Sequence, residues 1–275
     1  TKVIASAGAS AGLAAAFNAP MASLLFALEG LYHGFSSNVI VSCTLAGITA
    51  DIVSKSFFGF KPLFYIPIDQ VLPFEHYYAI LIVGIVASIL GILFNKSLLL
   101  FNDVFKRVRF GRVLIPTLVA LILVLTFPYV VGGGYDIIES LVNGKVSIIF
   151  LIVLLFLKFA FTCLSYASAA PGGIFLPVLS IGATIGAILY IVTTFFIPAL
   201  APFANSFLIF GMLGFFTAVV KAPVTGIVLI MEVTQNVTIF SSIAFVAILS
   251  YLVTEVFGSE PIYDTLMKRL IAENR

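Results

Sequence analysis

The sequence contains a segment whose residue types could bind an anion inside a membrane. Residues 168–177 read SAAPGGIFLP, with long apolar runs on both sides. Pro-Gly-Gly interrupts helices, so one helix should end before it and another should begin after it. The second helix would then present the N–H groups of Gly173, Ile174 and Phe175 and the positive end of its dipole, which together attract anions. On spacing alone, a plain helix–loop–helix connection fits equally well.

A second pattern occurs twice. Residues 14–29 read AAAFNAPMASLLFALE and residues 217–232 read TAVVKAPVTGIVLIME, and they align without a gap at an offset of 203 (223 − 20). Each copy has Ala-Pro and, nine residues after the proline, a glutamate, which is Glu29 or Glu232. Because proline is tolerated in the first turn of a helix, each copy predicts a short helix that begins there. Broken helices at matching positions of two halves indicate a transporter built from repeats.

The composition is that of a polytopic membrane protein. Of the 275 residues, 61% are hydrophobic and 9% are charged, and the mean hydropathy is +1.21. Several apolar runs reach the roughly 20 residues that a spanning helix needs. The net charge of +2 gives no reason to expect a nucleic-acid partner. Helices are expected at 2–17, 20–31, 36–57, 75–104, 111–128, 146–165, 174–197, 205–219, 223–233, 237–257 and 261–272, with a short amphipathic piece after the Gly132-Gly133-Gly134 turn.

The placement of charge predicts the orientation in the cell membrane. Basic residues gather in the loop 106–112 and at the C-terminus; they are Lys106, Arg107, Arg109, Arg112, Lys268, Arg269 and Arg275. By the positive-inside rule, both regions should face the cytoplasm. The loop at 59–77 would then lie outside, and one spanning helix at 78–104 connects the two sides.

The remaining chemically capable residues favour structural roles. Cys43 and Cys163 lie in apolar runs and are expected to be small buried residues, without a disulfide or a metal site. His33 and His76 are expected at the membrane interface, and Lys158 is expected to snorkel or to be paired. The apolar segments contain no Ser/His/Asp set, paired acids or His-rich spacing, so neither an enzyme nor a cofactor is expected.

Four segments together resemble the CLC family of chloride channels and proton-coupled chloride transporters. SAAPGGIFLP is similar to the family's GxFxP anion-binding motif. The other three are GLAAAFNAPMASLLFALE at 12–29, GMLGFFTAVVKAPVTGIVLIMEVTQN at 211–236, and Pro261-Ile262-Tyr263 at the start of the last helix. The resemblance implies an all-α, CLC-type inverted-repeat bundle with broken and re-entrant helices. It also implies a homodimer in the bilayer, with one pore in each subunit.

The resemblance implies roles for individual residues. The N–H groups of Ile174 and Phe175, next to Gly173, would coordinate a central chloride ion, and the Tyr263 hydroxyl would donate to it from the cytoplasmic side. Without the motif, Tyr263 would be interpreted as an interfacial tyrosine. The fluoride-selective branch departs from GxFxP, so Phe175 favours chloride.

The resemblance also divides the chain. Residues 1–57 would be the end of the first inverted repeat, 58–77 an external linker, 78–257 the second repeat, and 258–275 the C-terminal pore-lining helix. The family's serine loop and its gating-glutamate loop would both precede Thr1. We therefore expect a front-truncated core, and an inactive or assembly-only fragment is one alternative function.

Proton coupling depends on a departure from the family pattern. Many proton-coupled members carry two glutamates where this chain has Glu29 and Gly30, and the second glutamate transfers protons. Glu29 is a candidate for the proton path, although the matching Glu232 favours a structural carboxylate at a helix end. A chloride channel, an H+/Cl− exchanger and another repeat-built secondary transporter all remain open.

Overall fold

The computed structural model describes residues 2–60, 62–68, 70–108, 111–144, 146–170 and 172–273. Within these ranges the chain is helical and contains no strand. The helices are α1 (Lys2–Phe17), α2 (Pro20–Phe26), α3 (Ser37–Phe58), α4 (Tyr77–Lys106), α5 (Leu114–Thr126), α6 (Tyr135–Asn143), α7 (Ile148–Ala167), α8 (Phe175–Phe196), α9 (Ala204–Val220), α10 (Pro223–Thr234), α11 (Phe240–Val256) and α12 (Ile262–Glu273). The expected sites Pro171, Arg109 and Arg275 lie outside the described residues.

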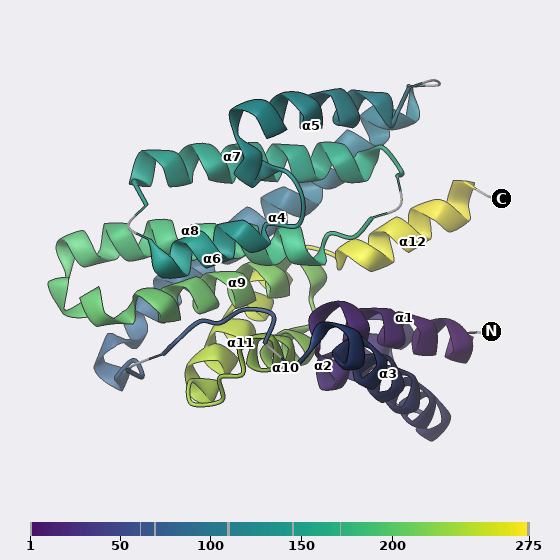
Figure 1. Ribbon diagram of the computed structural model, residues 1–275, viewed down its shortest axis with the longest axis horizontal. Helices are drawn as coiled ribbons and strands as arrows, with labels where there is room; N and C mark the ends of the chain where they lie inside the picture. The colour runs from purple at the N-terminus through teal and green to yellow at the C-terminus, as the bar shows by residue number, and fades with distance from the viewer. Residues whose placement is uncertain are drawn as a thin grey trace.

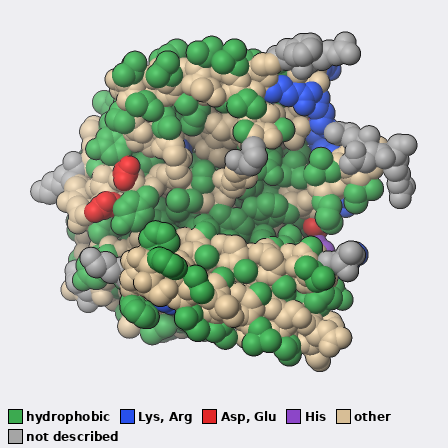
Figure 2. Space-filling view, turned by 45° about the vertical axis from the view of Figure 1, so that its right-hand side comes forward, with side chains coloured by type: hydrophobic (Ala, Val, Ile, Leu, Met, Phe, Trp, Pro, Cys, Tyr) green, Lys and Arg blue, Asp and Glu red, His purple; other side chains and the backbone are tan. Residues whose placement is uncertain are grey.

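The helices form a layered bundle with one smaller group at its side. In Figure 1, α5, α7, α8 and α9 lie one below another, α4 crosses behind them, and α1, α2 and α3 form the group near the N-terminus. Among the described residues, five helices are long and apolar enough to cross a membrane. Figure 2 shows hydrophobic side chains over most of the visible face and Lys and Arg together at one end. The protein is therefore a multi-pass, all-α membrane protein.

The helices break where the repeated prolines predicted. Asn18, with a φ of 52°, directly follows the end of α1, and Lys221, with a φ of 58°, directly follows the end of α9. These two positions differ by 203 (221 − 18), the offset of the sequence repeat. Left-handed residues end helices, and the following Pro20 and Pro223 begin the next ones. The helix pairs α1–α2 and α9–α10 thus break with the same local geometry.

Two expected elements differ in detail. The helix expected at 20–31 is α-helical only to Phe26 and continues as a π-helical segment, η1 (Ala27–Tyr32). The helix expected at 111–128 spans only Leu114–Thr126, and a separate 3-10 turn follows at Pro128–Val130. A π segment widens the helix locally and is common at functional sites. Periodicity of apolar residues does not distinguish it from an α-helix.

Small residues let the central helices approach closely. A Cβ added to Gly182 of α8 would lie 2.6 Å from the carbonyl oxygen of Gly211 in α9. α4 packs against α9 at Gly91, whose added Cβ would lie 2.5 Å from Ala218 Cβ. Polar groups support this contact, because Asn95 Nδ2 donates to the Val219 carbonyl at 3.0 Å. Close backbone packing replaces the hydrophobic effect as the force that joins helices in lipid.

Candidate anion site

The Pro-Gly-Gly break opens onto a cavity of about 540 Å³. Gly173, Ile174 and Phe175, the three residues expected to bind the anion, all line it. Most of the remaining lining comes from the end of α1, the turn before α6, the end of α7 and the first turn of α8, and Leu63 adds one residue from the segment before α4. The lining includes Phe17, Val131, Gly132, Gly133, Thr162, Ser165, Tyr166, Leu176 and Pro177. The cavity therefore lies where the end of α1, the turn before α6 and the end of α7 meet the start of α8.

The start of α8 supplies the donors. Ile174 is the N-cap residue, Phe175 is the first helical residue, and no side chain caps this end. The first N–H groups of a helix have no partner within it, and they carry about half a positive charge. Pro177 lies in the first turn, where proline is tolerated. The cavity wall at α8 can therefore bind an anion through backbone N–H groups alone.

Lys158 stabilises the cavity wall opposite the start of α8. Its Nζ donates to the carbonyls of Val130 at 2.9 Å and Gly132 at 2.7 Å. The side chain is only 1% exposed, so the expectation that it snorkels to the interface is wrong and the expectation that it is paired is confirmed. Ser180 Oγ also donates to the Gly133 carbonyl at 3.3 Å. A buried ammonium group thus fixes the glycine turn and places positive charge beside the cavity.

Four aromatic rings contact the ring of Phe175 at the start of α8, and we call these five rings the aromatic cluster. The Phe175 ring centroid lies 4.9 Å from Phe26, 5.8 Å from Phe17, 5.1 Å from Phe216 and 6.1 Å from Tyr263. Phe26 and Tyr263 also pack edge to face at 5.6 Å. Phe17 and Phe175 line the cavity, whereas Phe26, Phe216 and Tyr263 do not. The cluster therefore brings Tyr263 to the site, with the Phe175 ring next to it.

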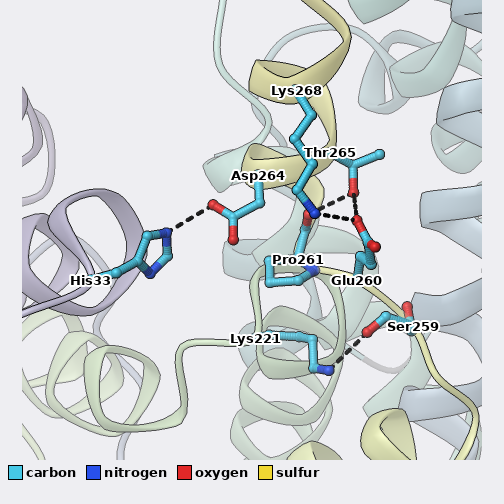
Figure 3. Close-up of polar contacts among 8 residues, drawn as sticks. All are labelled: His33, Lys221, Ser259, Glu260, Pro261, Asp264, Thr265 and Lys268. Atoms are coloured by element: carbon cyan, nitrogen blue, oxygen red, sulfur yellow. Dashed lines mark hydrogen bonds and ion pairs between the residues drawn. The ribbon is translucent and has the colours of Figure 1, made fainter.

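Polar contacts hold the start of α12, and hence Tyr263, from two sides (Figure 3). His33 Nε2 lies 2.9 Å from Asp264 Oδ1 and links η1 to α12. Lys221 Nζ donates to the Ser259 carbonyl at 2.7 Å and connects the end of α9 to the approach to α12. Lys268 Nζ donates to Glu260 Oε2 at 3.0 Å within this end of the helix.

The two repeat glutamates cap each other's half-helices. Glu29 accepts hydrogen bonds from the N–H groups of Val224 at 3.3 Å and Thr225 at 2.8 Å, at the start of α10. Glu232 accepts from Met21 at 3.0 Å and Ala22 at 2.7 Å, at the start of α2. The expectation that a neighbouring helix end satisfies the Glu29 carboxylate is confirmed, and its role in a proton path stays a prediction. Carboxylates at helix N-termini satisfy donors and complement the helix dipole.

Sequence reasoning missed part of the site. Phe26 and Phe17 were not recognised, because a phenylalanine in an apolar run carries no signal of its own. Lys158 and the Gly132–Gly134 turn had signals, a charge inside an apolar run and three consecutive glycines. Nothing in the sequence placed this turn opposite the start of α8.

The comparisons with known proteins agree with this geometry. Residues 1–255 match the family described as "Voltage gated chloride channel". The H(+)/Cl(−) exchange transporter ClcA of Salmonella paratyphi A is 32% identical over 275 residues, which cover 97% of this chain and 58% of the relative. ClcA of Vibrio campbellii is 31% identical over 278 residues, covering 98% and 59%. The chain thus spans more than half of the length of these relatives.

Solved structures show the same fold. The crystal structure of a slow cyanobacterial Cl−/H+ antiporter superposes with a TM-score of 0.92 at 26% identity, covering 99% of this chain and 66% of that one. A CLC-type fluoride/proton antiporter superposes with a TM-score of 0.74 at 23% identity, covering 90% and 61%. A donor-lined cavity at a broken helix, the twin half-helices and the sequence match agree, and this chain belongs to the voltage-gated chloride channel family.

Proposed function

We propose that this protein moves chloride and similar anions across the cell membrane through the site at the start of α8. The observation that carries the proposal is the cavity of about 540 Å³, which is lined by Gly173, Ile174 and Phe175 at an N-terminus without a side-chain cap. Backbone donors at a helix start suit a monovalent anion, because they stabilise it without a full opposite charge. Lys158, buried behind the facing turn, adds a positive potential that attracts anions.

We propose chloride as the ion that is moved. The similar curated proteins are named H(+)/Cl(−) exchange transporters, which supports protons as a second substrate. Glu29 is the remaining candidate for a proton path, but its carboxylate accepts three hydrogen bonds, from two N–H groups and from Thr225 Oγ1 at 2.7 Å. Position 30 is a glycine and cannot carry protons.

The orientation and assembly belong to the same proposal. The loop 106–112 and the C-terminus face the cytoplasm, because positive charge gathers there. The first repeat ends at 57, a linker occupies 58–77, the second repeat occupies 78–257, and residues 258–275 line the pore. Two copies form a homodimer, as the family resemblance implies. Cysteine labelling from each side of the membrane tests the orientation, and cross-linking in native membranes tests the dimer.

Efflux from lipid vesicles tests the transport function. Purified protein in chloride-loaded vesicles should release chloride faster than empty vesicles, and fluoride more slowly than chloride. Tyr263→Leu should weaken chloride binding measured by calorimetry, whereas Tyr65→Leu, at a loop tyrosine that is 78% exposed, should not. No efflux of any halide above empty vesicles would refute the proposal.

A second experiment tests proton coupling. Proton uptake that is driven by a chloride gradient and is lost in Glu29→Gln would show that Glu29 carries protons.

A further inference from the structure

Gly30 lies directly against the ring of Phe26. A Cβ added at Gly30 would lie 2.8 Å from Phe26 Cε2 and 2.9 Å from Phe26 Cδ2. Both distances are shorter than a carbon–carbon contact of about 3.5–4.0 Å allows. Any side chain at position 30, including the glutamate that many proton-coupled members have there, would displace the Phe26 ring.

The displaced ring has little room. Phe26 is 6% exposed, and its ring centroid lies 4.9 Å from that of Phe175 and 5.6 Å from that of Tyr263. The backbone of Gly30 is also held in place, because its neighbour Glu29 is hydrogen-bonded to the start of α10 and His33 is hydrogen-bonded to Asp264. η1 is therefore held at Glu29 and at its C-cap His33, and a new methyl group would press on the Phe26 ring, which packs against Phe175.

We propose that Gly30 is a positioning residue that seats the Phe26 ring against both Phe175 and Tyr263, beside the path from the anion cavity towards Tyr263. Phe175 lines the cavity and Phe26 does not, so the Phe26 ring supports the side of Phe175 that faces α12. Its position sets how much room an anion has when it passes from the cavity towards Tyr263. The absence of a side chain at position 30 thereby controls the rate of anion passage. This inference rests on the proposed transport function.

A double-mutant cycle in vesicles tests the inference. Gly30→Ala presses the ring onto Phe175 and should lower the maximal chloride efflux by about tenfold, the factor that corresponds to about 1.4 kcal/mol. The chloride concentration at half-maximal efflux should change little, because the donors of α8 are untouched. Phe26→Val lacks the Cδ and Cε atoms and should raise the efflux. Gly30→Ala in the Phe26→Val background should have no further effect, because the clashing atoms are absent.

Gly84→Ala is the matched control. Its added Cβ would lie 2.7 Å from Leu249 Cδ2, a clash of the same size between α4 and α11, away from the anion cavity. Both alanine variants should lower the melting temperature, but only Gly30→Ala should change the efflux. Equal efflux changes in both variants, or an effect of Gly30→Ala that persists in Phe26→Val, would overturn the inference.

Melting temperatures distinguish a failure of this inference from a failure of the proposed transport function. If the wild-type protein moves no halide, the melting temperatures of the four proteins in the cycle still report the contact. Coupling between Gly30→Ala and Phe26→Val in melting temperature would then support the seating of Phe26 and refute only its effect on transport. No coupling in either measurement would overturn the inference outright.

Discussion

The reciprocal glutamate caps make a quantitative prediction about stability. Replacing Glu232 by glutamine keeps one side-chain oxygen and removes the charge. The wild-type carboxylate accepts hydrogen bonds from Met21 N–H at 3.0 Å and Ala22 N–H at 2.7 Å. The glutamine oxygen can accept from only one of them, and its amide group faces the other N–H donor-to-donor. One helix-start donor should therefore lose its partner.

The size of the expected stability loss follows from these contacts. A hydrogen bond to a charged group contributes roughly 1.5–3 kcal/mol. A charge at a helix terminus contributes a further 0.3–1 kcal/mol or so. Losing one bond and the charge should therefore lower the free energy of unfolding by about 3 kcal/mol. For a chain of this length, about 2–4 °C per kcal/mol gives a fall of about 6–12 °C in melting temperature.

A thiol-reactive dye provides the assay. Cys43 and Cys163 are both 0% exposed, so the dye should react only as the protein unfolds in detergent. Glu139→Gln, at an exposed position of α6, is the matched control and should melt with the wild type. A melting temperature of Glu232→Gln within about 1 °C of the wild type would refute the idea that this carboxylate joins the two repeats.

Three further predictions concern other contacts. Lys158→Met leaves the Val130 and Gly132 carbonyls without their buried donor and removes a positive charge beside the cavity. The chloride affinity measured by calorimetry should therefore fall at least about tenfold, and an unchanged affinity would exclude Lys158 from the site. Gly182→Ala places a methyl group 2.6 Å from the carbonyl oxygen of Gly211, which cannot move aside. The amount of folded protein recovered by size-exclusion chromatography should therefore fall sharply, and a normal amount would contradict the close packing of α8 and α9. The hydrogen bond from Lys268 holds the pKa of the Glu260 carboxyl below its usual range, so this contact stabilises the start of α12 at pH values above the usual pKa and is lost as pH falls through the lowered pKa. Lys268→Met should raise the pKa of Glu260, followed by NMR, towards its usual range, and an unmoved titration would exclude the contact.

Sequence reasoning predicted the membrane class, most helix positions and the residues at the start of α8. These features are local. A long apolar run spans a bilayer, a Pro-Gly-Gly break begins a helix, and a repeated Ala-Pro motif breaks two helices in the same way. The left-handed residues Asn18 and Lys221 show that the repeat extends to backbone geometry.

Other features escaped prediction because they depend on partners that are distant in the sequence. The sequence left open whether Lys158 snorkels or is paired, because its carbonyl acceptors, Val130 and Gly132, lie on the turn before α6. The π-helical turn of η1 was missed because apolar periodicity does not separate it from an α-helix. Phe26 was missed because its importance comes from Phe175 and Tyr263, which lie far along the chain.

The sequence by itself determined a chain of membrane helices with two matching breaks and one helix start that can bind an anion, since composition, proline and glycine act locally. Only the tertiary structure decided what surrounds that start. It placed Glu29 and Glu232 on each other's half-helices, set Lys158 behind the glycine turn, and packed Phe26 against Gly30 and Phe175. The reason is physical: hydrogen bonds and ring contacts depend on distances in space, and those are fixed when the two repeats pack together.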